Sequence, residues 1–314
     1  MCIMRYDGSI TDIRGISVGC AADAEGATGV TAVMFDRLMT AGVDVRGGGP
    51  GTFNTDILSP MTGGGVLDCI VLSGGSGFGL GSMYGAEKWL EEKCKGFDTG
   101  IKRIPMVSGA IIFDLDFGSS DVWPTPEMAY EACENAGTSV QEGSFGAGTG
   151  ATVGKLLLEK SREKSGQGTC SIDLGGGLMV GAIAVVNALG DVCDGGRIIA
   201  GAHNDKGEHL DTLKAMLCGE RADVFGKNTT ISVVATNADL SGAMTTKLAM
   251  MAHDGYAAAI RPVHTLADGD TVFAVSTGEL KADGEINRIL AASAEAMRRA
   301  IVNAVLAKDG RRCQ

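Results

Sequence analysis

Glycine is the feature of this sequence that most narrows the structures it can adopt. The 314-residue chain contains 48 glycines, about twice the average share of roughly 7%. They are scattered among apolar runs without the three-residue period of collagen, and the six prolines do not suggest a disordered linker. Because glycine permits tight turns and close backbone approaches, this distribution predicts a packed protein whose many short elements are joined by tight turns.

Short apolar runs alternate with segments of helical periodicity along the chain. Strands are predicted over residues 29–35, 66–72, 104–113, 177–189, 229–236 and 271–276. Helices are predicted over residues 83–93, 149–164 and 241–252, and over a last segment with apolar residues at 286, 290, 294, 297, 301 and 305. The long polar stretch 206–228 is predicted to be an exposed connection. This mixture predicts an α/β or α+β layered sandwich.

Charge and hydropathy exclude several classes of partner. The chain has 27 Lys and Arg against 38 Asp and Glu, a net charge of −11, and nucleic acids and anionic membranes both favour clustered positive charge. The apolar runs are shorter than the roughly 18 residues of a membrane span. Nine cysteines without a C-x-x-C pair, after a start that lacks the pattern of a signal peptide, predict reduced thiols and a cytoplasmic protein.

Two glycine-rich segments, 74–79 and 146–150, leave open a non-enzymatic protein that binds nucleotides or other anions. Residues 148–156 resemble a phosphate-binding loop, but Thr149 stands where a glycine is required and Leu156 stands where Ser or Thr is required. Residues 146–151 also match the looser dinucleotide-binding pattern, which arises easily in a chain so rich in glycine.

Common catalytic and metal-binding signatures are missing from the sequence. It has no G-x-S-x-G motif, and its four histidines include no H-E-x-x-H pair. His203, Asp205 and His209 fit a solvated loop better than a metal site. We therefore expect neither a metal nor an organic cofactor.

One junction stands out from its surroundings. The polar stretch ends at Asn228, and a dense β-branched strand begins at Thr229. Taken alone, this junction is typical of a turn before a strand, and Asp268-Gly269 is typical of a hairpin turn. Asn187, a single amide within an apolar strand, must find hydrogen-bond partners wherever it is buried.

Residues 228–240 (NTTISVVATNADL) and 251–277 (MAHDGYAAAIRPVHTLADGDTVFAVST) closely resemble the P1 family of peptidases. This family includes L-aminopeptidase/D-esterases, β-aminopeptidases and the nylon-oligomer endohydrolase. The similarity continues upstream, through residues 46–60, 71–80, 146–156 and 177–192. The resemblance implies a single domain over residues 1–314 with the αββα sandwich of N-terminal-nucleophile hydrolases, a fold related to that of ornithine acetyltransferases.

The resemblance also implies a precursor that cuts itself between Asn228 and Thr229, giving an α chain (1–228) and a β chain (229–314) that stay associated. Elementary chemistry agrees with this scheme. A threonine hydroxyl needs an adjacent base, and a free α-amino group with a pKa of about 7.7–8.0 is such a base near neutral pH. In the uncut chain that nitrogen is an amide, so the cut would also switch the enzyme on.

Five further residues take roles by the same resemblance. Asp268 and Asp270 would orient the hydroxyl and amine of the nucleophile, and two close carboxylates raise the pKa of one of them. Asn187 would donate its side-chain amide to the oxyanion, and Lys155, otherwise a solvated helix cation, would face the nucleophile. Phe113 stands where the nylon-oligomer hydrolase has a tyrosine, so a substrate hydrogen bond there is in doubt.

The implied substrates are small peptides or amides, including β-amino and nylon-like oligomers. Family habit implies a homo-oligomer, a tetramer of αβ units, without nucleic acid or membrane partners. An acyltransferase of the ornithine-acetyltransferase type is the alternative enzyme, because it differs only in using an amine instead of water to take the acyl group.

Overall fold

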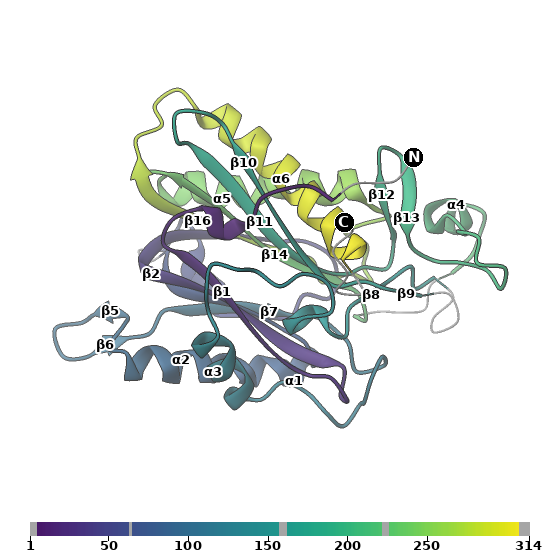
Figure 1. The fold of residues 1–314 in the computed structure, drawn as a ribbon, viewed down its shortest axis with the longest axis horizontal. Coiled ribbons are helices and arrows are strands. Elements are labelled where there is room, and N and C mark those ends of the chain that lie inside the picture. The colour runs from purple at the N-terminus through teal and green to yellow at the C-terminus, as the bar shows by residue number, and fades with distance from the viewer. Residues whose placement is uncertain (1–4, 63–64, 157–161, 222–225, 308–314) are drawn as a thin grey trace.

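The computed structural model describes residues 5–62, 65–156, 162–221 and 226–307. Its main sheet has nine strands and mixed directions (Figure 1). Eight of them lie side by side in the order β10 (Gln167–Asp173), β11 (Met179–Asn187), β14 (Thr229–Ala238), β16 (Thr271–Leu280), β2 (Thr28–Val45), β4 (Val66–Ser73), β7 (Val107–Ile111) and β3 (Thr52–Phe53). The ninth strand, β1 (Ile16–Asp23), pairs with β2.

The long strand β2 divides this sheet into two halves. Its first part pairs with β1 and β4, whereas Thr40–Val45 pairs with β16. Residues from both halves, among them Phe35, Leu72, Val233 and Phe273, are buried in one shared cluster. The halves therefore pack face to face and enclose a core between them, as stacked sheets do.

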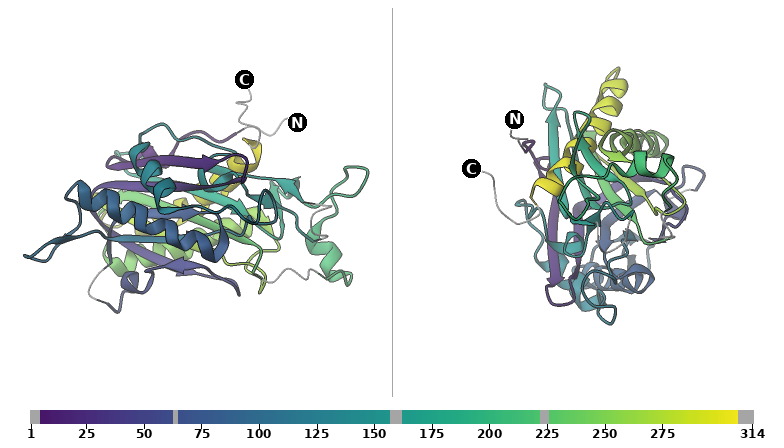
Figure 2. Two further views of the ribbon diagram at one scale, coloured as in Figure 1. Left: turned by 90° about the horizontal axis from the view of Figure 1, so that it is seen from below. Right: turned by 90° about the vertical axis from the view of Figure 1, so that its right-hand side faces the viewer.

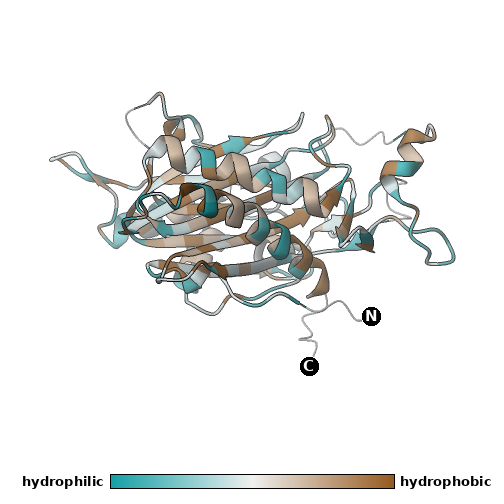
Figure 3. Cartoon of the chain, turned by 90° about the horizontal axis from the view of Figure 1, so that it is seen from above, coloured by the Kyte–Doolittle hydropathy of each residue, from teal (hydrophilic) through white to brown (hydrophobic). Residues whose placement is uncertain are grey.

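Helices cover the two outer faces (Figure 2). On one side α5 (Gly242–Ala259) and α6 (Ile286–Leu306) pack on β10, β11 and β14; on the other side α2 (Met83–Glu92) and α3 (Pro126–Glu134) pack on β1, β2 and β4. Figure 3, seen from above, shows apolar residues concentrated in the strands beneath the helices. The layers run helix, sheet, sheet, helix, which confirms the predicted αββα sandwich.

β14 shows why the sequence builds this arrangement. All ten of its residues are buried, and its side chains alternate between two cores because successive residues of a strand point to opposite faces. Ile231 and Val233 enter the central core, while Val234 enters the core under α5 and α6. The strand pairs antiparallel with β11 and parallel with β16, so both of its edges are occupied.

Smaller elements lie at the ends of the sheet. They comprise β5 (Phe97–Asp98), β6 (Arg103–Ile104), β8 (Thr152–Val153), β9 (Glu163–Lys164), β12 (Asp191–Asp194), β13 (Arg197–Ala200), β15 (Ile260–Arg261), α1 (Ser76–Gly79), α4 (Thr212–Leu217), and 3₁₀ turns at Ile10–Asp12, Asp56–Leu58, Leu80–Ser82 and Gly146–Gly148. Within the polar stretch predicted to be an exposed connection, the described residues 206–221 and 226–228 are exposed or half-buried apart from Thr212 and Asn228, and they include α4.

The helix predicted over residues 149–164 is wrong in the part that the structure describes. That part contains the short paired strands β8 and β9, while residues 157–161 lie outside the described ranges. Gly154 has a φ of +70° and packs against the backbone of Ala202 so closely that a Cβ would lie 1.9 Å from its nitrogen. A left-handed glycine wedged against another segment interrupts a helix, and the next residue, Lys155, is buried.

Candidate active site

Thr229 is the first residue of β14 and lies opposite Asn187, the last residue of β11. Both side chains are buried. Asn228, just before the strand, forms an isolated parallel bridge with Asp268, and β16 begins three residues after Asp268. Because β14 and β16 run parallel, their first residues meet at one end of the sheet. Asp268-Gly269 is therefore not the turn of a two-stranded hairpin.

The Asn228–Thr229 peptide bond is surrounded by polar contacts. The Thr229 hydroxyl donates to the carbonyl oxygen of Asn228 at 2.5 Å, and the backbone N–H of Gly269 donates to the same oxygen at 2.8 Å. A Cβ on Gly269 would lie 2.4 Å from the carbonyl oxygen of Gly49 and 2.9 Å from the Thr229 hydroxyl. Only glycine allows this amide to approach the carbonyl so closely.

Lys155 and Asn187 form the second part of the site. The Lys155 ammonium donates to the Asn187 side-chain oxygen at 2.6 Å and to the Lys227 carbonyl at 3.2 Å. The Asn187 oxygen also accepts the N–H of Thr152 at 3.0 Å. Lys155 is thus a buried group beside the Asn228–Thr229 bond, as the family resemblance implies, and is not a solvated helix cation.

Burial lowers the pKa of Lys155 to about 7, although the charges of Asp116 and Asp268 act in the opposite direction. Taking an ammonium out of water disfavours its charged form. A lysine with such a pKa exchanges its proton near neutral pH. It can therefore supply either a positive charge or a free amine to the neighbouring groups.

The Asn187 amide also connects the site to Phe113. Its NH₂ group donates to the Phe113 carbonyl at 2.9 Å, so the predicted oxyanion donor has a backbone partner in the uncut chain. The Lys227 ammonium lies 5.8 Å from the centroid of the half-buried Phe113 ring. Phe113 therefore lies beside the candidate site, and its carbonyl contributes to the site independently of the ring.

Asp268 is buried and held by three donors. Thr265 donates its N–H at 3.0 Å and its hydroxyl at 2.6 Å, and Leu189 donates its N–H at 3.4 Å. Burial, together with the charge of Asp270, raises the pKa of Asp268 to about 6. A raised pKa on one member is the effect expected of two close carboxylates.

Asp270 is buried deeper and bonds directly to the strand of the nucleophile. One carboxylate oxygen accepts the N–H of Thr230 at 2.7 Å, and the other accepts the His264 ring nitrogen Nδ1 at 2.7 Å and the His264 backbone N–H at 3.2 Å. Sequence reasoning missed both His264 and Thr265. Each lies within the segment that resembles the family, but neither has a spacing that marks it as functional.

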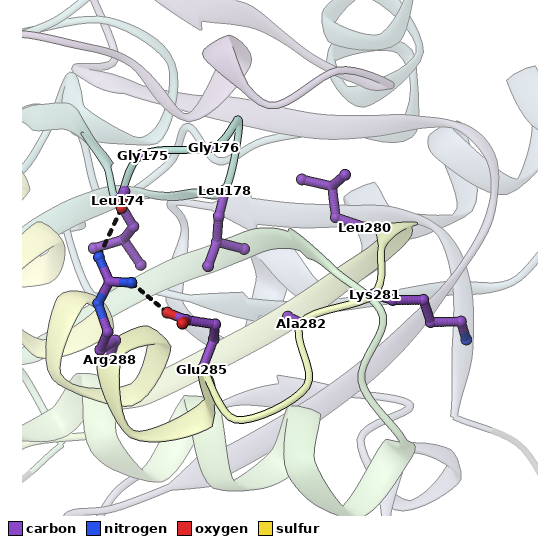
Figure 4. Close-up of a pocket in the computed structure, with 9 residues that line it drawn as sticks. All are labelled: Leu174, Gly175, Gly176, Leu178, Leu280, Lys281, Ala282, Glu285 and Arg288. Carbon is purple, nitrogen blue, oxygen red and sulfur yellow. Dashed lines mark hydrogen bonds and ion pairs between the residues drawn. The ribbon is translucent and has the colours of Figure 1, made fainter.

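The other sequence candidates lie apart from this cluster or carry no ligand-binding arrangement. His203 and His209 form a bridge in a loop, and no group of three potential metal ligands occurs within the described residues. A pocket of about 490 Å³ lies near Leu178 and Leu280, at the opposite end of β14 from Thr229 (Figure 4). Two of its charged side chains, Glu285 and Arg288, bond to each other, and the third, Lys281, pairs with Asp239. It contains none of the predicted site residues.

The fold matches that of solved structures of N-terminal-nucleophile hydrolases. The structure superposes with a TM-score of 0.71 on a β-aminopeptidase of Burkholderia sp., covering 97% of this chain and 87% of that one at 21% identity. The same score and identity relate it to the L-aminopeptidase D-Ala-esterase/amidase of Ochrobactrum anthropi, described as a variant of that hydrolase fold, over 97% and 87% of the two chains.

Residues 8–312 match the model of peptidase family S58, and the chain belongs to this family. It is 38% identical to an uncharacterized aminopeptidase of Mycobacterium leprae over 96% of this chain and 91% of the relative. It is 32% identical to a 6-aminohexanoate-oligomer endohydrolase of Paenarthrobacter ureafaciens over 86% and 75%. These matches confirm the predicted family and a hydrolase of peptide or amide bonds, and they favour it over the acyltransferase and the anion-binding module.

Among the described residues, no helix is both long and apolar enough to cross a membrane.

Proposed function

We propose that this protein is a self-processing N-terminal-threonine hydrolase of small amides or peptides. The observation that carries the proposal is the contact between the Thr229 hydroxyl and the Asn228 carbonyl, whose oxygen also accepts the Gly269 N–H. A nucleophile beside a carbonyl, with a backbone donor on the carbonyl oxygen, is the arrangement required for attack and for stabilising the resulting oxyanion.

The self-cleavage proceeds by attack of the Thr229 hydroxyl oxygen on the Asn228 carbonyl carbon. The C–N bond breaks, the hydroxyl proton ends on the departing nitrogen, and an ester joins Asn228 to Thr229. Water then hydrolyses the ester, giving a chain of residues 1–228 and a chain that begins with Thr229. The Gly269 N–H supports the charge on the carbonyl oxygen during both steps, because it is already 2.8 Å away.

In the cut enzyme the Thr229 amine takes the proton from its own hydroxyl. The hydroxyl attacks the substrate carbonyl, the amine or amide leaving group departs with a proton, and water releases the acid from the acyl-enzyme. Asp270 keeps the start of β14 in place through Thr230, Asp268 provides negative charge near the amine, and Lys155 with Asn187 provides positive charge and a donor for the oxyanion.

The proposed substrate class follows from the names of the relatives. One relative is named an aminopeptidase and another a 6-aminohexanoate-oligomer endohydrolase, so we propose short peptides, amino-acid amides or oligomers of ω-amino acids. We also propose a homo-oligomer of αβ units. The seven cysteines that the structure describes are unpaired thiols, which supports a reducing compartment such as the cytoplasm.

Intact-mass spectrometry and N-terminal sequencing of the purified protein test the proposal. We expect fragments of about 23 and about 9 kDa, in proportion to their shares of the 32.1 kDa chain, and a second N-terminus reading Thr-Thr-Ile-Ser. Assays with L-alanine p-nitroanilide and with the linear trimer of 6-aminohexanoate test the hydrolysis. A single uncut chain that hydrolyses either compound at full rate would refute the mechanism.

A further inference from the structure

His264 has no role in the reaction as described so far, yet it contacts the deepest carboxylate of the site. Its ring nitrogen Nδ1 lies 2.7 Å from Asp270, and its backbone N–H donates to the same oxygen at 3.2 Å. The other Asp270 oxygen accepts the N–H of Thr230, the residue next to the nucleophile. His264 is therefore connected to Thr229 through one carboxylate and one peptide unit.

The surroundings of the His264 ring indicate which of its nitrogens donates. A carboxylate can only accept, so the contact with Asp270 places a proton on Nδ1. The other ring nitrogen, Nε2, is buried and has no hydrogen-bond partner among the described residues. The contact of the ring with Asp270 is therefore a hydrogen bond donated by Nδ1.

A second histidine packs behind the first. The ring centroids of His253 and His264 are 4.7 Å apart at 74°, and His253 Nε2 contacts the Asp44 carbonyl at 3.0 Å. Burial lowers the pKa of His253 to about 4, so this ring carries no positive charge near neutral pH. His253 therefore packs behind His264 without adding charge beside Asp270.

The remaining charged and titratable groups around the pair do not neutralise Asp270 either. Strand β2 contributes Asp44, and the guanidinium of Arg46, which follows the strand, donates to Asp44 at 2.8 Å. Helix α5 contributes His253 and Tyr256, whose hydroxyl bonds to Ser232. The charge of Lys155 acts on Asp268 across the site. Among the hydrogen bonds of the described residues, the only one that Asp270 accepts from a side chain comes from His264.

We propose that His264 is a positioning residue for the Thr229 reaction: the hydrogen bond from its ring to Asp270 keeps Asp270 the ionised member of the carboxylate pair, and so places the proton that the pair takes up on Asp268. The inference rests on the proposed function. Hydrogen bonds to a carboxylate favour its ionised form, and an ionised Asp270 repels the charge of Asp268. The assignment makes Asp268 the group whose protonation slows the reaction in acid.

The test compares two variants that differ in one donor. The φ of His264 is +58°, a conformation that asparagine and glycine both tolerate. His264→Asn keeps an N–H donor near the position of Nδ1, whereas His264→Gly has none. kcat/KM is measured across the pH range, with whichever of L-alanine p-nitroanilide and the 6-aminohexanoate trimer the wild type hydrolyses, after intact mass has shown that each variant is cut.

We expect Asp268 to add a step near pH 6 to the acid limb of the wild-type profile, below the step of the Thr229 amine. His264→Gly should move the Asp268 step downward by about one pH unit, because Asp270 without this hydrogen bond takes up the proton in place of Asp268, and His264→Asn should leave the step in place. His253→Phe, a control that preserves ring packing without touching Asp270, should lower the thermal midpoint but not move the limb. His264→Ala replaces the glycine variant where the latter is too unstable to purify.

Equal shifts in the asparagine and glycine variants, or a loss of rate by the same factor at every pH, would overturn the proposal and leave His264 a packing residue. These outcomes are distinct from failure of the proposed function. In that case the wild type itself would remain a single chain or hydrolyse neither compound.

Discussion

Two buried carboxylates in this protein have nearly the same anchoring but different surroundings. Asp191 accepts the N–H and the hydroxyl of Thr212 at 2.6 and 2.8 Å, together with the N–H of Ala202 at 2.8 Å. Asp268 accepts the N–H and the hydroxyl of Thr265, together with the N–H of Leu189. Burial raises the pKa of both carboxyl groups. The hydrogen-bond pattern by itself therefore does not separate a structural carboxylate from a catalytic one.

What separates them is the charge and chemistry next to them. Asp191 ties β12 to the segment that leads into α4. Asp268 lies two residues from a second buried carboxylate, within reach of the Lys155 charge, and beside the Gly269 amide that contacts the Asn228 carbonyl. Buried groups of like and opposite charge gathered around one peptide bond are costly to a fold. Such a cluster marks function more reliably than the pocket near Leu280.

Removal of the nucleophile should have the largest effect, because it leaves Asp268 with an anchoring role only, like Asp191. Thr229→Ala should remain a single 32.1 kDa chain and lose hydrolysis by on the order of 10⁴-fold or more, since no hydroxyl remains to attack. Mass spectrometry and the amide assay measure both. Cleavage of this variant at the same bond would show that Thr229 does not cut the chain.

Removal of the buried cation should come next. Lys155→Met keeps the length of the side chain but takes away the charge beside Asn187, and we expect self-cleavage and hydrolysis to slow by about 10²- to 10³-fold. The control is Lys164→Met. The Lys164 ammonium donates to the carbonyls of Gly148, Ala151 and Ser165, so its loss should lower the thermal midpoint and leave kcat/KM of the folded enzyme unchanged.

The two carboxylates themselves give the direct comparison. Asp268→Asn should slow turnover by about 10²-fold or more without loss of stability, because a single amide oxygen can still accept both hydrogen bonds from Thr265. Asp191→Asn should cost about 1–3 kcal/mol of stability, because both Asp191 oxygens accept short hydrogen bonds, and it should leave the turnover of the folded fraction intact. Denaturant titration and kcat/KM are measured on both variants. Equal losses of stability and turnover in both variants would remove the distinction drawn here.

The dependence of stability on pH should distinguish Asp268 from its asparagine variant. The folded-state pKa of Asp268 is raised from 3.8 to about 6. The protonated carboxyl group therefore contributes fully to the stability of the fold below the unfolded-state pKa of 3.8, and this contribution is lost as the pH rises through about 6. Relative to Asp268→Asn, the wild type should lose on the order of 1–3 kcal/mol between about pH 4 and pH 7.5. Parallel stability curves for the two proteins would contradict the raised pKa.

Much of the fold was predictable from the sequence because periodicity reports burial. The β-branched run at 229–236 and the apolar spacing after residue 286 gave β14 and α6. The helix predicted over residues 149–164 was wrong for a physical reason. Gly154 adopts a positive φ and packs against Ala202, and such a tertiary contact does not change the spacing of apolar residues in the sequence. Family resemblance supplied Asp268 and Asp270. The role of His264 was not predicted, because its contact with Asp270 depends on the conformation of the loop between the two residues.

We expect the smallest effect on activity from a substitution at Phe113. This residue contacts the site through its backbone carbonyl and, separately, through its ring. The carbonyl receives the Asn187 amide and is unaffected by a change of side chain, whereas the half-buried ring lies under Lys227. Phe113→Tyr adds a hydroxyl at the edge of the site without moving that carbonyl. We therefore expect kcat to stay within about two-fold and KM for the 6-aminohexanoate trimer to change by a few-fold. A large fall in kcat would show that the ring, and not only the Phe113 backbone, positions the reacting groups.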